Sequence, residues 1–475
     1  MIDTKKINKN NNNNNRIQLI KLTIIERFQT SSIIAFQNVV RSEFMSIRII
    51  WLIFSLLSSC WCSWFIFRNI ADYLSHSVIT KTLVKHENGL IFPIVGICNL
   101  NPFNTEYAKI YLNEIFDNND PTKNNYYKSL YYANFMNMGS NSQFDRRLFG
   151  QNLTDFIVEC TFGYKNCDLT RDFEYYYDVN YGNCFRYNSG KDMLGRNQPK
   201  KYVYASGTSS ALEIVFLIGS VYENSFSFSN ENGFILFINN QSVDSNYHEG
   251  IAISTGTCTR IIVSSYTNIR QPKPYSVCIA DLSSIDSYHS DCYKKTFDSS
   301  NLDYDYTTCF FMCYQKFLGQ ICGCQSTYYN EMYFKTMRKC KISVTDNYED
   351  ADMKCEQSLW DNFTMNHYIN LCDCPIECEQ TGYNYKISVS EYPTKRYADY
   401  LIAKNSLIKS KMPNATHQEL KQSIGKVKIF YDELIHTIIT EEVKMELADL
   451  ISNAGGTLGL FLGLLLLIYF KLFEF

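Results

Sequence analysis

The sequence predicts a membrane protein in which two transmembrane helices flank a large, disulfide-rich α+β extracellular domain. Three observations lead to this class: two uncharged apolar segments, a basic flank before the first of them, and 18 cysteines concentrated between them. A bilayer core of about 30 Å needs roughly 20 apolar residues of helix, and each segment has about that length. No other part of the 475-residue chain is comparably apolar, so we expect two membrane spans.

The first apolar segment follows a basic N-terminal flank. Residues 1–48 carry eight Lys or Arg against three acidic residues, and the positive-inside rule therefore places them in the cytoplasm. The segment is uncharged from Ile49 to Phe67, starts too far into the chain and is too long for a cleaved signal peptide. We predict a cytoplasmic N-terminal segment over 1–48 and a first transmembrane helix over 49–68. The alternative is a buried helix of a soluble protein.

Two spans place residues 69–449 outside the cell. Every cysteine except Cys60 and Cys62, which fall inside the first span, lies in this part. An oxidising compartment favours disulfides over metal ligation, so we predict no metal site. Sequons for N-glycosylation support the same topology. Their asparagines are Asn152, Asn240, Asn362 and Asn414.

Hydrophobic patterning predicts that the extracellular part is mixed α+β. An apolar run that starts at Phe92 is stopped by Asn and Pro turn signals, as a short strand would be. Cys309 and Cys313 stand four residues apart in an apolar stretch and would share one face of a helix. Further strands are expected within 201–280, 381–388 and 425–431.

No catalytic motif stands out in the sequence. We find no glycine-rich phosphate loop, no GxSxG and no HExxH, and the seven His are scattered. We therefore predict neither an enzyme nor a cofactor. The net charge of −3 argues against nucleic acid as a partner. The extracellular part is more acidic, with 35 Lys or Arg against 44 Asp or Glu, which either concentrates cations or is an ordinary solvated surface.

The second apolar segment, residues 450–470, repeats Gly455, Gly459 and Gly463 at four-residue spacing. Small residues at this spacing line one helix face and let backbones approach closely in lipid. One interpretation is packing against another helix, and a sharper one is a pore in which copies of the helix converge. A two-span chain cannot enclose an aqueous path alone, so conduction requires a closed oligomer. Residues 471–475 would be a cytoplasmic stub, an end that a truncated gene model would also produce.

Motifs along nearly the whole chain occur in one order. They are Phe92-Pro93-x-Val95-x-Ile97-Cys98-Asn99-Leu100-Asn101, Tyr181-Gly182-x-Cys184, Cys309-x3-Cys313, Cys372-x-Cys374-x3-Cys378 and Gly455-Gly456-x-x-Gly459-Leu460-Phe461-x-Gly463. With these motifs and its two spans, the sequence resembles the degenerin/epithelial sodium channel family, which includes acid-sensing and peptide-gated channels. The resemblance implies a trimer around a central cation pore. Each subunit would be a clenched hand with palm strands, a finger region and a thumb at roughly 279–378.

The resemblance also implies a disulfide framework, which would make the thumb rigid enough to transmit force. Carried over by motif, the pairs are Cys98–Cys184, Cys160–Cys167, Cys278–Cys378, Cys309–Cys374, Cys313–Cys372, Cys322–Cys355 and Cys324–Cys340. Cys258 and Cys292 remain, and a guess pairs them.

For gating, the resemblance implies an aromatic contact between the top of the first span and the base of the thumb. By position this would be Tyr73 against Tyr275, the alternative being two unrelated surface tyrosines. Ser452 falls where the family tolerates only small residues, because bulk there props the pore open. The implied outer pore and gate are Ser452, Asn453, Gly455, Gly456 and Gly459, and the implied selectivity filter or constriction is Gly463, Leu464 and Leu465.

The chain departs from the family pattern at several pore positions. Ala35-Phe36 stands where the family has a His-Gly pair, and Leu465 replaces a serine of the constriction. Asn453 replaces an acidic residue. Lys471 places a cation low in the second span, which is unfavourable in a cation pore.

We therefore predict a subunit of a trimeric, sodium-selective channel of the plasma membrane, with both termini in the cytoplasm. An unknown extracellular ligand, protons or force would open it, and amiloride would block it as it blocks the family. The expected partners are sodium ions, the lipid bilayer and related subunits in a homo- or heterotrimer. The alternative is a non-conducting or accessory subunit, or a receptor, of the same fold, which the departures favour. A two-span ecto-enzyme is a weaker alternative.

Overall fold

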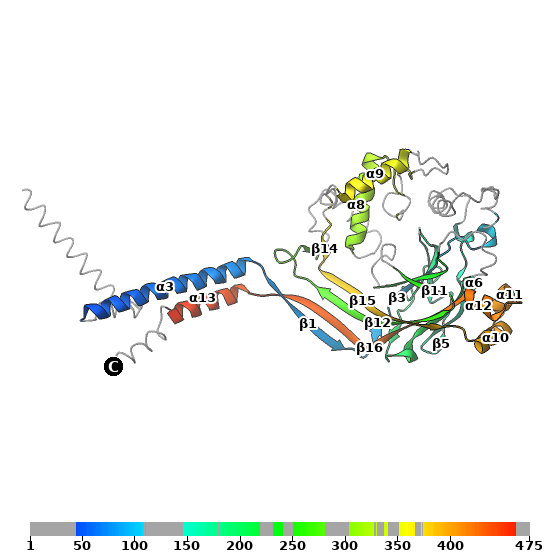
Figure 1. Ribbon diagram of the computed structural model, residues 1–475, viewed down its shortest axis with the longest axis horizontal. Helices are drawn as coiled ribbons and strands as arrows, with labels where there is room; N and C mark the ends of the chain where they lie inside the picture. The colour runs from blue at the N-terminus through cyan, green and yellow to red at the C-terminus, as the bar shows by residue number, and fades with distance from the viewer. Residues whose placement is uncertain are drawn as a thin grey trace, which may run out of the picture. The chain divides into compact units, whose positions relative to one another are not determined.

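The computed structural model describes residues 44–461, except 109, 111–145, 179, 219–230, 241–249, 281–303, 327–328, 330–336, 341–350, 366–371 and 373. Figure 1 shows the helices and strands of the described residues. In chain order they are α3 (Met45–Leu74), β1 (Val78–His86), β2 (Leu90–Ile91), β3 (Ile94–Asn99), η1 (Arg146–Leu148), α6 (Leu153–Phe156), β4 (Ile157–Phe162), β5 (Lys165–Asn166), β6 (Phe173–Asp178), β7 (Gly182–Tyr187), β8 (Tyr202–Val203), η2 (Thr208–Ser210), β9 (Leu212–Leu217), β10 (Gly233–Asn239), β11 (Ile251–Ser254), β12 (Thr257–Ile269), β13 (Cys278–Ile279), α8 (Tyr306–Ile321), α9 (Ala351–Met365), β14 (Ile376–Glu377), β15 (Glu379–Glu391), α10 (Lys395–Lys404), α11 (Ser406–Lys411), α12 (His417–Ser423), β16 (Ile424–Val443) and α13 (Leu447–Phe461).

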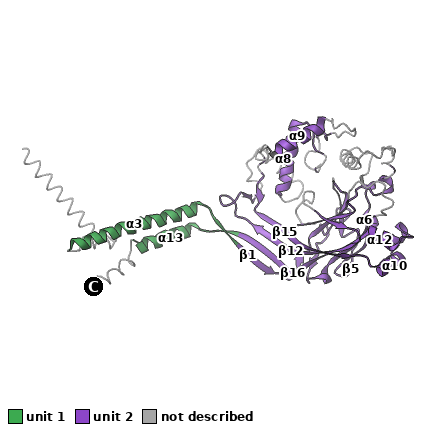
Figure 2. Ribbon diagram, in the orientation of Figure 1, with its two compact units in different colours: residues 1–80, 441–475 green, residues 81–440 purple. Residues whose placement is uncertain are grey.

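The chain divides into two units, which Figure 2 colours separately: residues 1–80 with 441–475, and residues 81–440. In the first unit, α3 is the described helix that is long and apolar enough to cross a membrane. It begins four residues before the predicted span 49–68 and ends six residues after it, because no Pro or Gly interrupts either flank. Its 30 residues extend about 45 Å, more than the thickness of a hydrocarbon core.

Helix α13 lies beside α3 within this first unit. The hydroxyl of Ser58 on α3 donates a hydrogen bond to the carbonyl oxygen of Phe461 (2.6 Å). The rings of Phe65 and Phe461 stack with their centroids 5.7 Å apart. The described part of α13 covers residues 450–461 of the predicted span 450–470, and the remainder of that span lies outside the described residues.

The main element of residues 81–440 is a seven-stranded sheet in the order β15-β12-β16-β9-β4-β5, in which β1 also pairs with β16. β12 runs antiparallel to β15 along its whole length and parallel to β16. The strands predicted at 381–388 and 425–431 are present as β15 and β16, and both are longer than predicted. The parallel pair brings together strands that more than 150 residues of chain separate.

A five-stranded sheet, β11-β10-β3-β7-β6, packs against the first sheet and encloses a large hydrophobic core with it. The strands predicted within 201–280 are β8 to β12, and the run from Phe92 forms β3. Alternate side chains of each strand point into the core, as the twofold period of a strand requires. Its members include Val95, Ile97, Phe185, Phe216, Phe234, Ile261, Val427 and Ile429.

The opposite face of the seven-stranded sheet is partly covered by the short helices α10, α11 and α12, which bury Leu401, Ile408 and Leu420 against it. Cys258 at the start of β12 belongs to this second cluster and is a buried free thiol. The guessed pair Cys258–Cys292 is therefore wrong. A disulfide needs a second sulfur at about 2 Å, whereas Cys258 packs among apolar side chains; Cys292 lies outside the described residues.

Helices α8 and α9 form a third cluster, within the range 279–378 where the resemblance implies a thumb, and we call this range the thumb. The side chain of Asp305 caps the N-terminus of α8 by accepting hydrogen bonds from the N–H (2.8 Å) and the hydroxyl (2.9 Å) of Thr308. Cys309 and Cys313 are both fully buried, so the predicted shared helix face is the one that packs. The short parallel pair of β13 and β14 joins the two ends of this segment.

Candidate pore and gating elements

The residues predicted for the outer pore and gate lie on α13, and all are exposed in the single chain. They are Ser452, Asn453, Gly455, Gly456 and Gly459. A Cβ atom added at any of the three glycines would meet no atom within 4 Å beyond its chain neighbours and the adjacent backbone of its own helix. This part of α13 therefore has a bare backbone surface that nothing in the described chain covers.

Helical geometry places this surface on the side of α13 that faces away from α3. At about 100° per residue, Ser452 and the three glycines cluster on one face, and Phe461 lies roughly 180° from Ser452 around the helix. Phe461 is the residue that contacts α3. Of the two interpretations of the glycine repeat, packing against the chain's own first helix does not apply to Gly455 and Gly459.

Several predicted site residues lie where the structure does not test their roles. Gly463, Leu464 and Leu465 are outside the described residues. Tyr73 lies in the last turn of α3, and the N–H of Tyr275 closes a turn by donating to the carbonyl oxygen of Pro272 (3.1 Å). These two tyrosines belong to different units, and their coupling stays a prediction.

A hydrogen-bonded chain that the sequence did not reveal crosses three strands of the seven-stranded sheet. His436 on β16 lies with Nδ1 3.0 Å from the hydroxyl of Ser265 and Nε2 3.0 Å from the hydroxyl of Thr267, both on β12. The Thr267 hydroxyl lies 2.8 Å from that of Thr381 on β15. Both ring nitrogens are thus used, which fixes the orientation of the imidazole. No sequence signal points to this series of hydrogen bonds, because the series depends on the parallel pairing of strands that are distant in the sequence.

The pairing of β12 with β16 changes register immediately before the Ser265–His436 hydrogen bond. Val263 is opposite Tyr431 and Ser265 is opposite His436, so two residues of β12 correspond to five of β16. The intervening residues of β16 form a bulge on which Asp432 and Glu433 are exposed. The bulge separates a part of β16 that is buried in the main core from a part that is half-exposed.

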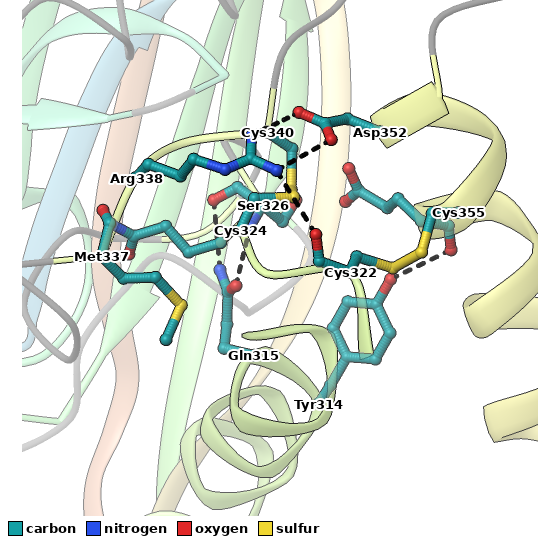
Figure 3. Close-up of a disulfide and its surroundings, with 12 residues drawn as sticks. Tyr314, Gln315, Cys322, Cys324, Ser326, Met337, Arg338, Cys340, Asp352 and Cys355 are labelled. Atoms are coloured by element: carbon teal, nitrogen blue, oxygen red, sulfur yellow. Dashed lines mark hydrogen bonds and ion pairs between the residues drawn. A yellow bond between two sulfur atoms is a disulfide. The ribbon is translucent and has the colours of Figure 1, made fainter. Parts of the chain in front are cut away.

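The thumb is held by a network of side-chain clamps between its disulfides (Figure 3). The side chain of Gln315 on α8 accepts from the N–H of Ser326 (2.8 Å) and donates to its carbonyl oxygen (3.2 Å). Arg338 makes a two-pronged ion pair with Asp352 on α9, at 2.6 and 3.0 Å. Cys322–Cys355 and Cys324–Cys340 join the same loop to itself and to α9.

Seven disulfides are present among the described residues. They are Cys98–Cys184, Cys160–Cys167, Cys278–Cys378, Cys309–Cys374, Cys313–Cys372, Cys322–Cys355 and Cys324–Cys340, the pairs that the family resemblance implies. Cys278–Cys378 closes the longest loop, across the base of the thumb, with a sequence separation of 100. Cross-links over long loops restrict the unfolded chain most and typically contribute about 2–4 kcal/mol each.

Two carboxyl groups of the thumb have raised pKa values. Burial raises the pKa of Glu356, a hydrogen bond from Ser326 lowers it in part, and the charge of Asp352 raises it again. Burial likewise raises the pKa of Glu377, which the N–H of Tyr306 partly offsets by donating to the carboxylate (2.6 Å). These groups take up protons more readily than exposed glutamates do.

The comparison with known protein families assigns the chain. The family described as "Amiloride-sensitive sodium channel" matches residues 28–475. The chain belongs to this family.

Curated relatives in the family carry different stimuli in their names. A bile acid-sensitive ion channel of Rattus norvegicus is 23% identical over 473 residues, covering 92% of this chain and 84% of that protein. Acid-sensing ion channel 1 of Gallus gallus is 24% identical over 485 residues, covering 95% and 83%. An FMRFamide-activated amiloride-sensitive sodium channel of Cornu aspersum is 22% identical over 493 residues, covering 85% and 75%. Because the chain belongs to a family of ion channels, it is a membrane protein, and its family indicates that it is not an enzyme.

Proposed function

We propose that this family member is a subunit of a trimeric, sodium-selective cation channel of the plasma membrane, with both termini in the cytoplasm. Membership of the family supports a ligand-gated cation channel, because relatives are named for their response to bile acid, to acid and to the peptide FMRFamide. The stimulus of this chain would act on its extracellular part. The observation that carries the proposal is the bare glycine face of α13, which points away from α3.

Three copies of α13 would surround the pore with this face turned inward. Ser452 and Asn453 would lie at the outer mouth, and Gly463, Leu464 and Leu465 would form the constriction. Glycine at such positions lets backbones approach and leaves room for water and an ion. The opposite face, with Phe461, would stay packed on α3 of the same subunit.

Movement would reach the pore along the strands that continue into the two helices. β1 begins at Val78, shortly after α3 ends at Leu74, and α13 begins at Leu447, shortly after β16 ends at Val443. The proposed contact of Tyr73 with Tyr275 would add a second connection, from the first span to the base of the thumb. The sequon residues Asn152, Asn362 and Asn414 are exposed, which supports glycosylation there and an extracellular location; Asn240 is proposed as the fourth site.

Voltage clamp of cells that express the chain alone tests the proposal without knowledge of the stimulus. Ser452→Phe places bulk on the bare face, and we expect it to produce a constitutive inward current whose reversal potential follows the sodium gradient. Leu458→Phe is a matched control, because Leu458 is exposed on the same helix but lies about 120° away from Ser452. Absence of current from Ser452→Phe, with surface delivery confirmed by labelling, would contradict a pore formed by this chain alone.

A second candidate is a non-conducting or accessory subunit, or a receptor, with the same fold. Leu464 and Leu465 would narrow and dry the constriction, and Lys471 would oppose cations. This candidate predicts no current from the chain alone, but surface expression and altered current when the chain is co-expressed with a conducting relative.

A further inference from the structure

One face of the seven-stranded sheet carries a concentration of cationic side chains. Residues that are directly paired across strands point to the same side of a sheet. Arg260 of β12 is opposite Ser388 of β15 and opposite Lys428 of β16, and Lys428 is opposite Glu213 of β9. The alternating positions add two more cations to this face. We call the group the basic patch; its members are Arg260, Lys386, Lys426 and Lys428.

The patch is short of negative charge. Glu213 accepts ion-paired hydrogen bonds from Lys426 and from Lys428, each at 2.7 Å, so one carboxylate is shared by two ammonium groups. A second carboxylate on this face, Glu159, lies beyond β9 and accepts a hydrogen bond from the hydroxyl of Tyr397 (3.3 Å).

Arg260 has no carboxylate partner among the residues that the structure describes. Its guanidinium donates to the hydroxyl of Ser390 over 3.4 Å, a long hydrogen bond that uses one of its five N–H groups. The half-buried Arg260 stands directly opposite the half-buried Lys428. Like charges at opposed positions of a sheet destabilise it, and partial burial reduces the screening by water. An anion bound beside Arg260 would reduce this repulsion.

The neighbourhood supplies the groups that an anion needs. Lys386, Ser388 and Ser390 on the edge strand β15 are all exposed, and Ser388 is paired directly with Arg260. A guanidinium offers a planar fork that matches a carboxylate or a sulfate, while hydroxyl and ammonium groups can complete the coordination. We propose that the basic patch is a binding site for an oxyanion, a carboxylate or sulfate-type group, with Arg260 as its main donor.

Binding can be measured on the purified full-length chain in detergent, so the result does not depend on whether the chain conducts. Sodium sulfate and sodium benzenesulfonate are titrated calorimetrically at constant ionic strength in a chloride background. Saturable binding of sulfate alone identifies an inorganic oxyanion as ligand. Tighter binding of benzenesulfonate identifies an oxyanion carried on an organic body. Saturable binding of neither probe overturns the proposal.

Variants decide whether the binding occurs at this patch. A charge-assisted hydrogen bond accounts for roughly a tenfold change in affinity or more, so Arg260→Gln should weaken binding at least about tenfold. Arg260→Lys keeps the positive charge but loses the planar fork of the guanidinium. Its affinity for the anion should fall between those of the unaltered chain and of Arg260→Gln. Lys354→Gln on α9 removes an exposed cation elsewhere and should leave binding unchanged. Equal affinity of Arg260→Gln and the unaltered chain would overturn the proposal.

A variant in the opposite direction guards against a folding defect in Arg260→Gln. Glu213→Gln removes the carboxylate that competes for Lys426 and Lys428, and we expect it to bind the probe anion several-fold more tightly. A purely structural role of this cluster would give weaker or unchanged binding in that variant, which would also contradict the proposal.

Discussion

Ser58 on α3 and Phe461 on α13 join these two helices of one chain, through a hydrogen bond of 2.6 Å from the hydroxyl to the carbonyl oxygen. The Phe461 ring adds a stacking contact with Phe65 on α3. One residue of α13 thus makes both a polar and an aromatic contact with α3. It determines which face of α13 is turned away, and that face carries Ser452 and the glycines.

Removing the Phe461 ring should loosen this pair of helices. Phe461→Ala loses the aromatic stacking, worth about 0.5–1.5 kcal/mol beyond the buried area, while its backbone carbonyl still accepts from Ser58. We expect a lower thermal unfolding midpoint for the purified chain in detergent. Leu460→Ala is the control, because Leu460 is exposed on the same turn. Equal midpoints for the two variants would contradict the role given to Phe461.

Replacing His436 should destabilise the seven-stranded sheet locally. His436→Ala leaves the largely buried hydroxyls of Ser265 and Thr267 without the imidazole, and an unsatisfied buried polar group costs about 1–3 kcal/mol. The measurement is thermal or denaturant unfolding of the full chain. His86→Ala, which removes an exposed imidazole at the end of β1, should have almost no effect. A loss of stability as large in His86→Ala would mean that the hydrogen-bonded chain is not the cause.

The two hydrogen bonds of the Gln315 side chain should stabilise the loop between α8 and α9. Gln315→Ala removes both of its hydrogen bonds to the backbone of Ser326 in a buried place, so we expect a loss of about 1–3 kcal/mol. Hydrogen exchange of the loop should rise in this variant. Gln357→Ala, at an exposed position of α9, provides the comparison and should leave exchange unaltered.

Glu356 should make thumb stability depend on pH. Its pKa is raised above the ordinary 4.5, so the folded chain binds this proton more tightly than the unfolded chain does. The contribution to stability is therefore full below pH 4.5 and is lost as the pH rises through the folded-state pKa. Glu356→Gln stays neutral throughout and should gain stability relative to the unaltered chain as the pH rises from 4 to neutrality, in a series of unfolding midpoints. A difference that does not vary with pH would contradict the raised pKa.

Cys258 should be recovered as a free thiol. Alkylation of the denatured, unreduced chain, followed by peptide mapping, should label Cys258, whereas the native chain should protect it because the thiol is buried. Cys98, which is disulfide-bonded to Cys184, should be labelled only after reduction. Recovery of a peptide that joins Cys258 to Cys292 would restore the guessed disulfide.

Local patterns predicted the elements, and long-range pairing decided what those elements bring together. The alternating runs within 201–280 are strands, and the spacing of Cys309 and Cys313 marks the buried face of α8. Neither pattern contains information about partners. His436 meets Ser265 only because β16 pairs in parallel with β12, and no single-sequence signal specifies that pairing.

The same limit explains the error at Cys258. The seven pairs that the structure contains came from motif resemblance, whereas Cys258 had no motif and was assigned a partner by guess. Its burial beneath α10 to α12 depends on which face of β12 the helices cover. The basic patch also escaped notice, because Arg260, Glu213 and Lys428 are far apart in the sequence and become neighbours only through sheet register.

The register change in β16 has a mechanical consequence. Between Val263 and Ser265, β12 advances two residues while β16 advances five, so β16 has three residues of slack at this place. An extended residue spans about 3.3 Å, so straightening the bulge would lengthen β16 by several ångströms. The part of β16 before the bulge, residues 426–431, could keep its pairing with β12. β12, which pairs continuously with β15 past the same place, would limit that travel. The continuous pairing of β12 with β15 would therefore limit how far β16 can shift along the sheet, even though β16 has three extra residues in its bulge.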